Sequence, residues 1–527
     1  MIRSSSEESD RDGATSEMRS RIRYHPLKSR SKAFVLTSAV FSNTFIRKYG
    51  IFSVILCLGL GYLFYTRVLY QQYIYQTLPL YQKSIRLRLG HSENYSDQVD
   101  RWKPIGDTSD RLQIYSAYFD PRLEVVHNFR VTEGTLPFGT VRIFSILPLK
   151  VRRREIYCHF RYANNRTVWH RADQVDAIHE NFGMEFSASY VVCKLVGNKH
   201  QVDIELPAEV GLTYDQDLSA MQPTSFVGIH YPSRHQDFLL RTPPRRKLAI
   251  CVGPAHHNYS NAARIVEFVE YWQLLGAERF YFYNKSVTAE VDRVMSYYRE
   301  RNVAEVLQWN LEGYEFEKDL RYEGIFAALN DCLYRATLVG DFHYTALVDF
   351  DEFLLPLRVI VPKNNDTTAA VAEEETLVQY LDRQGRFDVH SFNFEAVFFY
   401  GFYEEDFSKL PPGWANNTYL YTQFRTMRTK KPLMHHNRSK YVAVGRNVIE
   451  AGNHFVWRAM RDTNEYRVPE TEGLLFHYRD LCIGYGCETY VEDTSARRFG
   501  NEIQHSVDNV CQQLFPETGG VCPLGDD

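Results

Sequence analysis

Two hydrophobic periods alternate along the second half of the chain. Short apolar runs rich in Val, Ile, Phe and Tyr are typical of buried strands, and the segments between them carry apolar residues at helical spacing. The expected strands are 247–254, 278–284, 303–310 and 344–348, and the expected helices are 261–277, 290–301 and 321–340. This alternation predicts an α/β fold with a parallel sheet and crossover helices, whose strands end at one ligand-binding edge.

A different pattern precedes this unit. Between residues 112 and 206, stretches such as LQIYSAYFD and SYVVCKLVG are rich in β-branched and aromatic residues and are separated by turn residues. They predict a small, mostly-β domain over 109–242. The segment TPPRRK at 242–247 is the expected join to the α/β domain, 243–527.

The N-terminal part predicts a membrane anchor. Residues 1–48 are polar and mixed in charge, as in a disordered tail, whereas residues 49–66 contain no charge. Five Lys or Arg in 28–48 against three in 67–87 favour a cytosolic tail and a lumenal bulk, joined by a stem at 67–108. The segment follows a 48-residue tail and is not succeeded by small residues, which favours a retained signal anchor over a cleaved signal peptide. The alternative is a buried core helix.

Cysteines and glycosylation sequons agree with a lumenal location. Eight of the nine Cys follow the predicted anchor, an even number that suits disulfides in an oxidising compartment. The expected pairs are Cys158–Cys193, Cys482–Cys487 and Cys511–Cys522. Seven Asn-X-Ser/Thr sequons also follow the anchor, at Asn94, Asn165, Asn258, Asn284, Asn365, Asn416 and Asn437.

The charge balance narrows the class of partner. The 527 residues carry a net charge of −4 and no long basic run. Nucleic acid is therefore excluded as an expected partner.

The strongest chemical signal is the stretch YTALVDFDEFLLP at 344–356. Asp349 and Asp351 are two apart at the predicted end of the fourth strand, so their side chains are expected on the same side. Two such close carboxylates repel unless a cation or a proton lies between them. Oxygen ligands favour Mn²⁺ or Mg²⁺, which are often shared with substrate phosphates. The alternative is a solvated turn with helix-capping acids.

Several segments together resemble glycosyltransferase family 92, also known as the domain-of-unknown-function 23 family. The resemblance lies in CVGP, FVEYWQLLGAERFYFYN, LNDCLYR, VDFDEFLLP, SKYVAVGRNVIEAGNH and LLFHYRD, between residues 251 and 480. It implies a metal-dependent transferase with a nucleotide-sugar-binding GT-A fold in a type II Golgi membrane protein. Some characterised relatives in this family transfer β-linked galactose from UDP-galactose to fucose on N-glycan cores, which is the activity that the resemblance implies.

The resemblance also implies roles for residues near the carboxylate pair. Asp351 is expected to ligate a Mn²⁺ ion held by the diphosphate of the UDP-sugar, and Asp349 to contact that metal or the ribose. Glu352 is expected to brace the pair. His454 is the expected third protein ligand, with His477 as its rival. The residues expected to hold the donor diphosphate are Lys440 and Arg479.

The catalytic base that would deprotonate the acceptor hydroxyl stays open between two places. Glu395 lies among apolar residues, which would raise its pKa and suit a base. The other place is the cluster Glu404, Glu405 and Asp406, for which the alternative is a solvated loop.

Two other classes of protein compete with this interpretation. Metal-dependent phosphatases use an Asp-X-Asp motif, but theirs follows the first strand of the domain and this one follows the fourth. A membrane-anchored lectin-like protein would explain the anchor and the β domain, but it leaves the carboxylate pair unexplained.

Overall fold

The computed structural model describes residues 59–62, 65, 86–89, 100–106, 111–122, 125, 134–150, 156–198, 200, 203–214, 223–233, 242–357, 359–360, 373–386, 388–405, 420–482 and 486–525. Met1–Tyr70 and Gln71–Asp527 form two compact units. Most of the predicted anchor and all of the predicted tail lie outside the described residues; residues 59–62 and 65 are helical. In the part of the chain that the structure describes, no helix combines the length and the apolar character needed to cross a membrane.

A seven-stranded sheet forms the centre of the α/β part, with the order β14-β13-β12-β15-β22-β19-β25. The first four strands of this part are parallel to one another, as predicted, and β22 runs antiparallel to both β15 and β19. Their bounds are β12 Arg246–Cys251, β13 Ala277–Asn284, β14 Ala304–Gln308, β15 Phe342–Leu347, β19 Val389–Phe394, β22 Lys440–Val444 and β25 Asn464–Arg467.

Helices cover both faces of this sheet because successive strand residues point to opposite sides. Leu248 and Ile250 of β12 pack with α4 (Ala262–Leu274) and α5 (Ala289–Glu300). Ala249 and Cys251 pack with α6 (Ile325–Tyr334) on the other face. The helix prediction at 321–340 was wrong at its start, since Tyr322 and Glu323 have left-handed backbones, with φ of 41° and 52°. The helix begins at Ile325 and ends in a π-turn, Arg335–Val339.

A second, three-stranded sheet begins after β15. After the turn at Asp349–Asp351 the chain enters β16 (Glu352–Pro356), which pairs with β26 (Gly473–Arg479). β20 (Ala396–Tyr400) completes the order β16-β26-β20. The other elements of this part are α7 Leu377–Gln384, α8 Tyr421–Phe424, α9 Gly500–Leu514 and the strand pairs β17 Val359–Ile360 with β18 Glu373–Glu374, β21 Met427–Thr429 with β27 Tyr490–Glu492, and β23 Val448–Ala451 with β24 Val456–Ala459.

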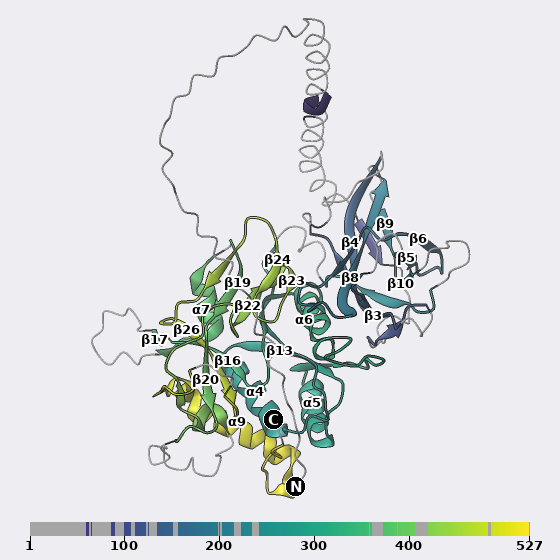
Figure 1. The fold of residues 1–527 in the computed structure, drawn as a ribbon. Coiled ribbons are helices and arrows are strands. Elements are labelled where there is room, and N and C mark those ends of the chain that lie inside the picture. Colours follow the sequence, from purple (N-terminus) through teal and green to yellow (C-terminus); the bar gives the residue numbers. More distant parts are fainter. Residues whose placement is uncertain are drawn as a thin grey trace, which may run out of the picture. The chain divides into compact units, whose positions relative to one another are not determined.

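The N-terminal strands form a separate nine-stranded sheet, in agreement with the predicted β-rich pattern. Its strands are β2 Lys103–Pro104, β3 Gln113–Asp120, β4 Thr135–Pro148, β5 Ile156–Arg161, β6 Thr167–Arg171, β7 Gln174–Ala177, β8 Phe186–Asn198, β10 Glu209–Tyr214 and β11 Val227–His230. β1 (Arg86–Leu89) pairs with β9 (Asp203–Leu206). β4 and β8 lie beside α6 (Figure 1). The predicted boundary near residue 242 stays a prediction, since both sheets belong to one compact unit.

A buried polar network joins the two sheets at α6. Asp331 has no exposed surface, and it accepts hydrogen bonds from the hydroxyls of Tyr118 (2.7 Å) and Tyr283 (2.6 Å). Arg335 lies 3.2 Å from Asp331 and 2.7 Å from Asp100. Buried charges are tolerated when they are paired in this way. The NDCLYR motif is therefore a joint between the two sheets.

The described part of the chain contains four disulfides. The three predicted pairs, Cys158–Cys193, Cys482–Cys487 and Cys511–Cys522, are confirmed. The fourth, Cys251–Cys332, connects β12 to α6.

Candidate functional site

The carboxylate pair lies at the point where the order of the strands in the sheet reverses. From β12 the chain builds β13 and β14 on one side and then crosses to β15 on the other. The carboxyl ends of β12 and β15 therefore flank the switch point, where open α/β sheets bind ligands. Asp349 and Asp351 follow the end of β15 by two and four residues. The topology thus places them at the expected binding edge.

Lys440 fixes Asp349. The side chain of Asp349 is 45% exposed, while Lys440 is only 2% exposed at the start of β22. The Lys440 Nζ donates to Asp349 Oδ2 at 3.0 Å and to Asn453 Oδ1 at 2.9 Å, and it lies 3.3 Å from Glu352 Oε2. Burial alone would lower the pKa of Lys440, but the charges of Asp349 and Glu352 raise it above its ordinary value. A permanent buried cation thus holds the first carboxylate.

Glu352 braces the turn, the role that the family resemblance implied. It is 1% exposed, and its Oε2 accepts the backbone N–H of Asp349 at 2.8 Å. Burial raises the pKa of Glu352 to about 7. Its side chain is buried, so it supports the carboxylate pair from the protein interior.

His477 fixes Asp351 from β26. Its Nε2 lies 3.1 Å from Asp351 Oδ2, and its Nδ1 lies 3.3 Å from Glu352 Oε1 without a hydrogen-bonding geometry. Burial alone would raise the pKa of Asp351, but the His477 charge lowers it below its usual value. The same two carboxylates raise the pKa of His477 against the effect of burial. The expected rival ligand is therefore an ion-pair partner of Asp351 in this structure.

Arg479 lies two residues beyond His477 on the same strand face. It is half-buried, its charge contributes to the low pKa of Asp351, and its guanidinium makes no hydrogen bond or ion pair with another residue that the structure describes. An unpaired guanidinium beside a carboxylate pair is suited to an incoming phosphate.

The His454 imidazole is neutral and carries its proton on Nδ1. Its Nδ1 lies 3.0 Å from the carbonyl oxygen of Ser439, which only accepts, so Nδ1 carries the proton. Burial lowers the pKa of His454 to about 4, which keeps the ring neutral at neutral pH. The Nε2 lone pair faces the Asn453 amide at 3.4 Å. A backbone-oriented neutral imidazole is the usual arrangement of ligating His.

The structure places the candidate bases in different surroundings. Glu395 follows β19, whose last residue Phe394 pairs with Lys440, and burial raises the pKa of Glu395. Glu405 instead accepts hydrogen bonds from Thr426 N, Thr426 Oγ1 and Met427 N at 2.7–3.0 Å, so both its oxygens serve the fold. Glu404 is exposed, and Asp406 lies outside the described residues. Glu395 is the candidate that the structure brings to the edge.

The carboxylate pair fits a cation that is shared with a substrate. Oδ2 of Asp349 accepts from Lys440 and Oδ2 of Asp351 lies beside His477 Nε2, whereas no other described residue donates a side-chain hydrogen bond to either Oδ1. One or two carboxylates completed by phosphate and water form the usual site for Mg²⁺-like ions. Asp349, Asp351 and His454 are not close enough to form a complete protein cage.

Another group has three potential metal ligands within 4.8 Å of one another, the only such group in the described part of the chain: His256, His257 and Glu323. Lys285 Nζ already contacts the Glu323 carboxylate. The group therefore fits an ion pair better than a cation site.

Asn453 is a site residue that the sequence did not reveal. It precedes His454 in a turn after β23, and only the fold brings its side chain to Lys440. The feature of the sequence that could have indicated Asn453 is its place between Gly452 and His454, the predicted metal ligand.

Comparisons with known proteins identify the family of this chain. The model of glycosyltransferase family 92 matches residues 246–514. The beta-1,4-galactosyltransferase galt-1 of Caenorhabditis elegans is 26% identical over 346 residues, covering 62% of this chain and 69% of that protein. A solved structure titled as the apo form of the WbbM bifunctional glycosyltransferase shares 8% identity over 37% of this chain and 28% of its own, with a TM-score of 0.16, which carries no structural conclusion. The family match spans just over half of the chain, so this chain belongs to glycosyltransferase family 92.

Proposed function

We propose that this chain transfers galactose from UDP-galactose to a glycan acceptor, such as fucose on an N-glycan core, with inversion and with Mn²⁺ or a similar cation. The observation that carries the proposal is the pair Asp349 and Asp351 at the topological switch point, each contacted by the side chain of another described residue at only one of its oxygens. The galactosyltransferase name of the nematode relative supports the choice of donor. The parallel strands β12–β15 with an antiparallel β22 support a GT-A fold for this domain.

In this proposal the acidic residues of the site bind the cation and a basic residue binds the diphosphate. Asp349 and Asp351 would hold the cation, and His454 Nε2, which does not form one three-ligand group with them in this structure, would be a further ligand. Arg479 would bind the diphosphate, while Lys440 orients Asp349 through its hydrogen bond to Oδ2. When bound, the cation would neutralise charge that develops on the leaving UDP.

Glu395 is the proposed base for the acceptor hydroxyl. Its raised pKa places it closer to neutral pH than an ordinary Glu, which suits proton transfer. Its side chain is 20% exposed, so an acceptor has access to it.

The proposed location is the Golgi membrane, with residues 49–66 as a type II anchor and the residues that follow the anchor in the lumen. Four disulfides support an oxidising compartment. Sequons at Asn165, Asn258, Asn284 and Asn437 lie in the described part.

A donor panel tests the proposed activity. The full-length chain is incubated with UDP-galactose, UDP-glucose, UDP-N-acetylglucosamine and UDP-N-acetylgalactosamine, using fucosylated N-glycans with and without Mn²⁺. We expect transfer from UDP-galactose that EDTA abolishes and Mn²⁺ restores, as measured by mass spectrometry of the glycan. Binding of the glycan without transfer from any donor would favour the lectin-like alternative, and transfer that persists in EDTA would contradict the metal.

A further inference from the structure

We propose that the loop between β7 and β8 of the N-terminal sheet is part of the catalytic edge, and that Glu180 in this loop is a positioning residue. In this proposal Glu180 acts through Asn453 on Lys440 and Asp349. The inference rests on the proposed function, because it assigns a role within the same site. It gives the N-terminal sheet a function in catalysis.

Three successive hydrogen bonds connect the loop to the carboxylate pair. Glu180 Oε2 accepts the backbone N–H of Asn453 at 2.8 Å. Asn453 Oδ1 accepts from Lys440 Nζ at 2.9 Å, and Lys440 Nζ donates to Asp349 Oδ2 at 3.0 Å. The Lys440 charge also acts on the pKa of Glu180, against the upward effect of burial. The loop and the site are thus electrostatically coupled.

The turn that carries Asn453 is packed too closely to adjust on its own. A Cβ on Gly452 would lie 2.6 Å from the Trp457 ring, so the ring lies directly on the backbone of the turn. The Tyr441 hydroxyl donates to the Gly452 carbonyl at 2.8 Å. The imidazole of His179, next to Glu180, stacks on Trp457 with centroids 5.0 Å apart. The loop therefore contacts this turn through two neighbouring side chains.

A second set of contacts fixes the loop to the β23–β24 hairpin. Glu450 of β23 has no exposed surface and accepts hydrogen bonds from His179 N and Tyr190 Oη, both at 2.9 Å. Arg458 of β24 donates to Asp176 of β7 at 2.8 Å. A buried carboxylate held by the other sheet is costly to leave without its partners. The hairpin and the loop are thus expected to move together.

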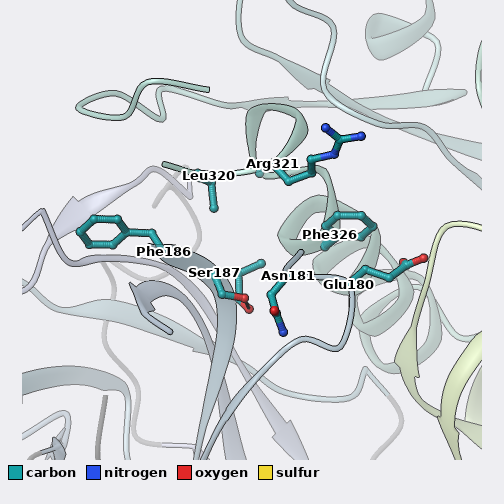
Figure 2. A pocket seen from close by; sticks show the side chains of 9 residues that line it. Glu180, Asn181, Phe186, Ser187, Leu320, Arg321 and Phe326 are labelled. Carbon is teal, nitrogen blue, oxygen red and sulfur yellow. Dashed lines mark hydrogen bonds between the residues drawn. The ribbon is translucent and has the colours of Figure 1, made fainter. Parts of the chain in front are cut away.

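The loop itself has a defined conformation. Asn181 bridges it, donating to the Ile178 carbonyl at 2.9 Å and accepting the Gly183 N–H at 3.0 Å. Figure 2 shows Glu180 and Asn181 on one side of a pocket and Arg321 and Phe326 on the other. The pocket has a volume of about 10 Å³, room for about one water molecule, so it cannot hold a sugar. The close fit indicates a supporting contact rather than a second ligand site.

A matched set of variants of the full-length chain tests the proposal. Glu180→Ala removes the contact to Asn453, and Glu185→Gln removes a charge from an exposed acid of the same loop. Substitution of a residue that orients metal ligands without contacting the metal typically lowers metal affinity or activity by about 10–100-fold. We expect Glu180→Ala to lose transfer by about that factor, with a higher Mn²⁺ requirement, and Glu185→Gln to match the wild type.

A double-mutant cycle separates positioning from general destabilisation. Asn453→Ala removes the amide that holds Lys440, so adding Glu180→Ala should lower activity little further if Glu180 acts through Asn453. Independent losses that multiply would overturn the proposal. So would a Glu180→Ala enzyme that transfers sugar as fast as Glu185→Gln.

Amide hydrogen exchange provides a readout that needs no substrate. Glu180→Ala should speed exchange at residues 452–455, and Glu185→Gln should not. Unchanged exchange there would contradict the coupling even if the wild type transferred no sugar. Absence of transfer by the wild type speaks against the proposed function, whereas equal transfer by both loop variants speaks against this inference alone.

Discussion

Replacing Asp351 with Asn is expected to reduce sugar transfer by roughly 10²–10³-fold, the size of effect seen when one group that stabilises transition-state charge is removed. The substitution keeps the shape of the side chain and an oxygen for the hydrogen bond from His477. It removes the negative charge that the proposed cation needs. The rate of galactose transfer at saturating Mn²⁺ measures the effect, with a thermal melt to verify folding.

Asp462→Asn is the matched control for this substitution. Asp462 is exposed in the same domain and has a left-handed backbone, with φ of 61°, which Asn also tolerates. It should transfer sugar like the wild type. A folded Asp351→Asn enzyme with the activity of this control would remove the carboxylate pair from the mechanism.

Replacing Lys440 with Met is expected to cost about 3–5 kcal/mol of folding stability as well as most of the activity. Met has a similar length but leaves Glu352, which is 1% exposed, with His477 as its remaining cationic neighbour. The variant should therefore unfold at a lower denaturant concentration, and Asp349 should lose its fixed orientation. Equilibrium denaturation and transfer assays on the same preparation measure both effects.

The stability loss of Lys440→Met should grow as the pH rises. Burial already raises the pKa of Glu352 to about 7, and Lys440 is the main charge that opposes this increase. A buried carboxyl with a raised pKa favours the folded state while it is protonated, below its unfolded pKa near 4.5, and this contribution is lost as the pH rises through the folded pKa. Unfolding at pH 5 and at pH 8 tests the sign.

Two lysine variants control this prediction. Lys440→Arg keeps the charge and should retain more stability than Lys440→Met, and Lys430→Met changes an exposed lysine and should have no effect. Equal stability of Lys440→Met and Lys430→Met at pH 8 would show that the buried ion pair does not support the fold.

The sequence predicted the elements whose pattern is local. β12 to β15 and the helices α4 and α5 follow from hydrophobic period, and the carboxylates were placed at the edge by strand order. The start of α6 was missed because left-handed residues at Tyr322 and Glu323 leave no periodic signal.

Contacts between segments far apart in the chain could not be predicted from the sequence. The link from Glu180 to Asn453 spans 273 positions, and nothing in either local pattern distinguishes it from a surface contact. Glu405 shows the opposite case, because an acidic cluster suggested a base and the fold uses both of its oxygens. Residues whose role depends on tertiary partners need the structure.

Binding of Mn²⁺ in the presence of UDP tests the central claim most directly. Calorimetry on the full-length wild type should show one Mn²⁺ that binds together with UDP, with an affinity at least about tenfold weaker in Asp351→Asn. Equal Mn²⁺ affinity in the wild type and in Asp351→Asn, or binding that depends on His257 instead, would contradict the assignment of the carboxylate pair as the cation site.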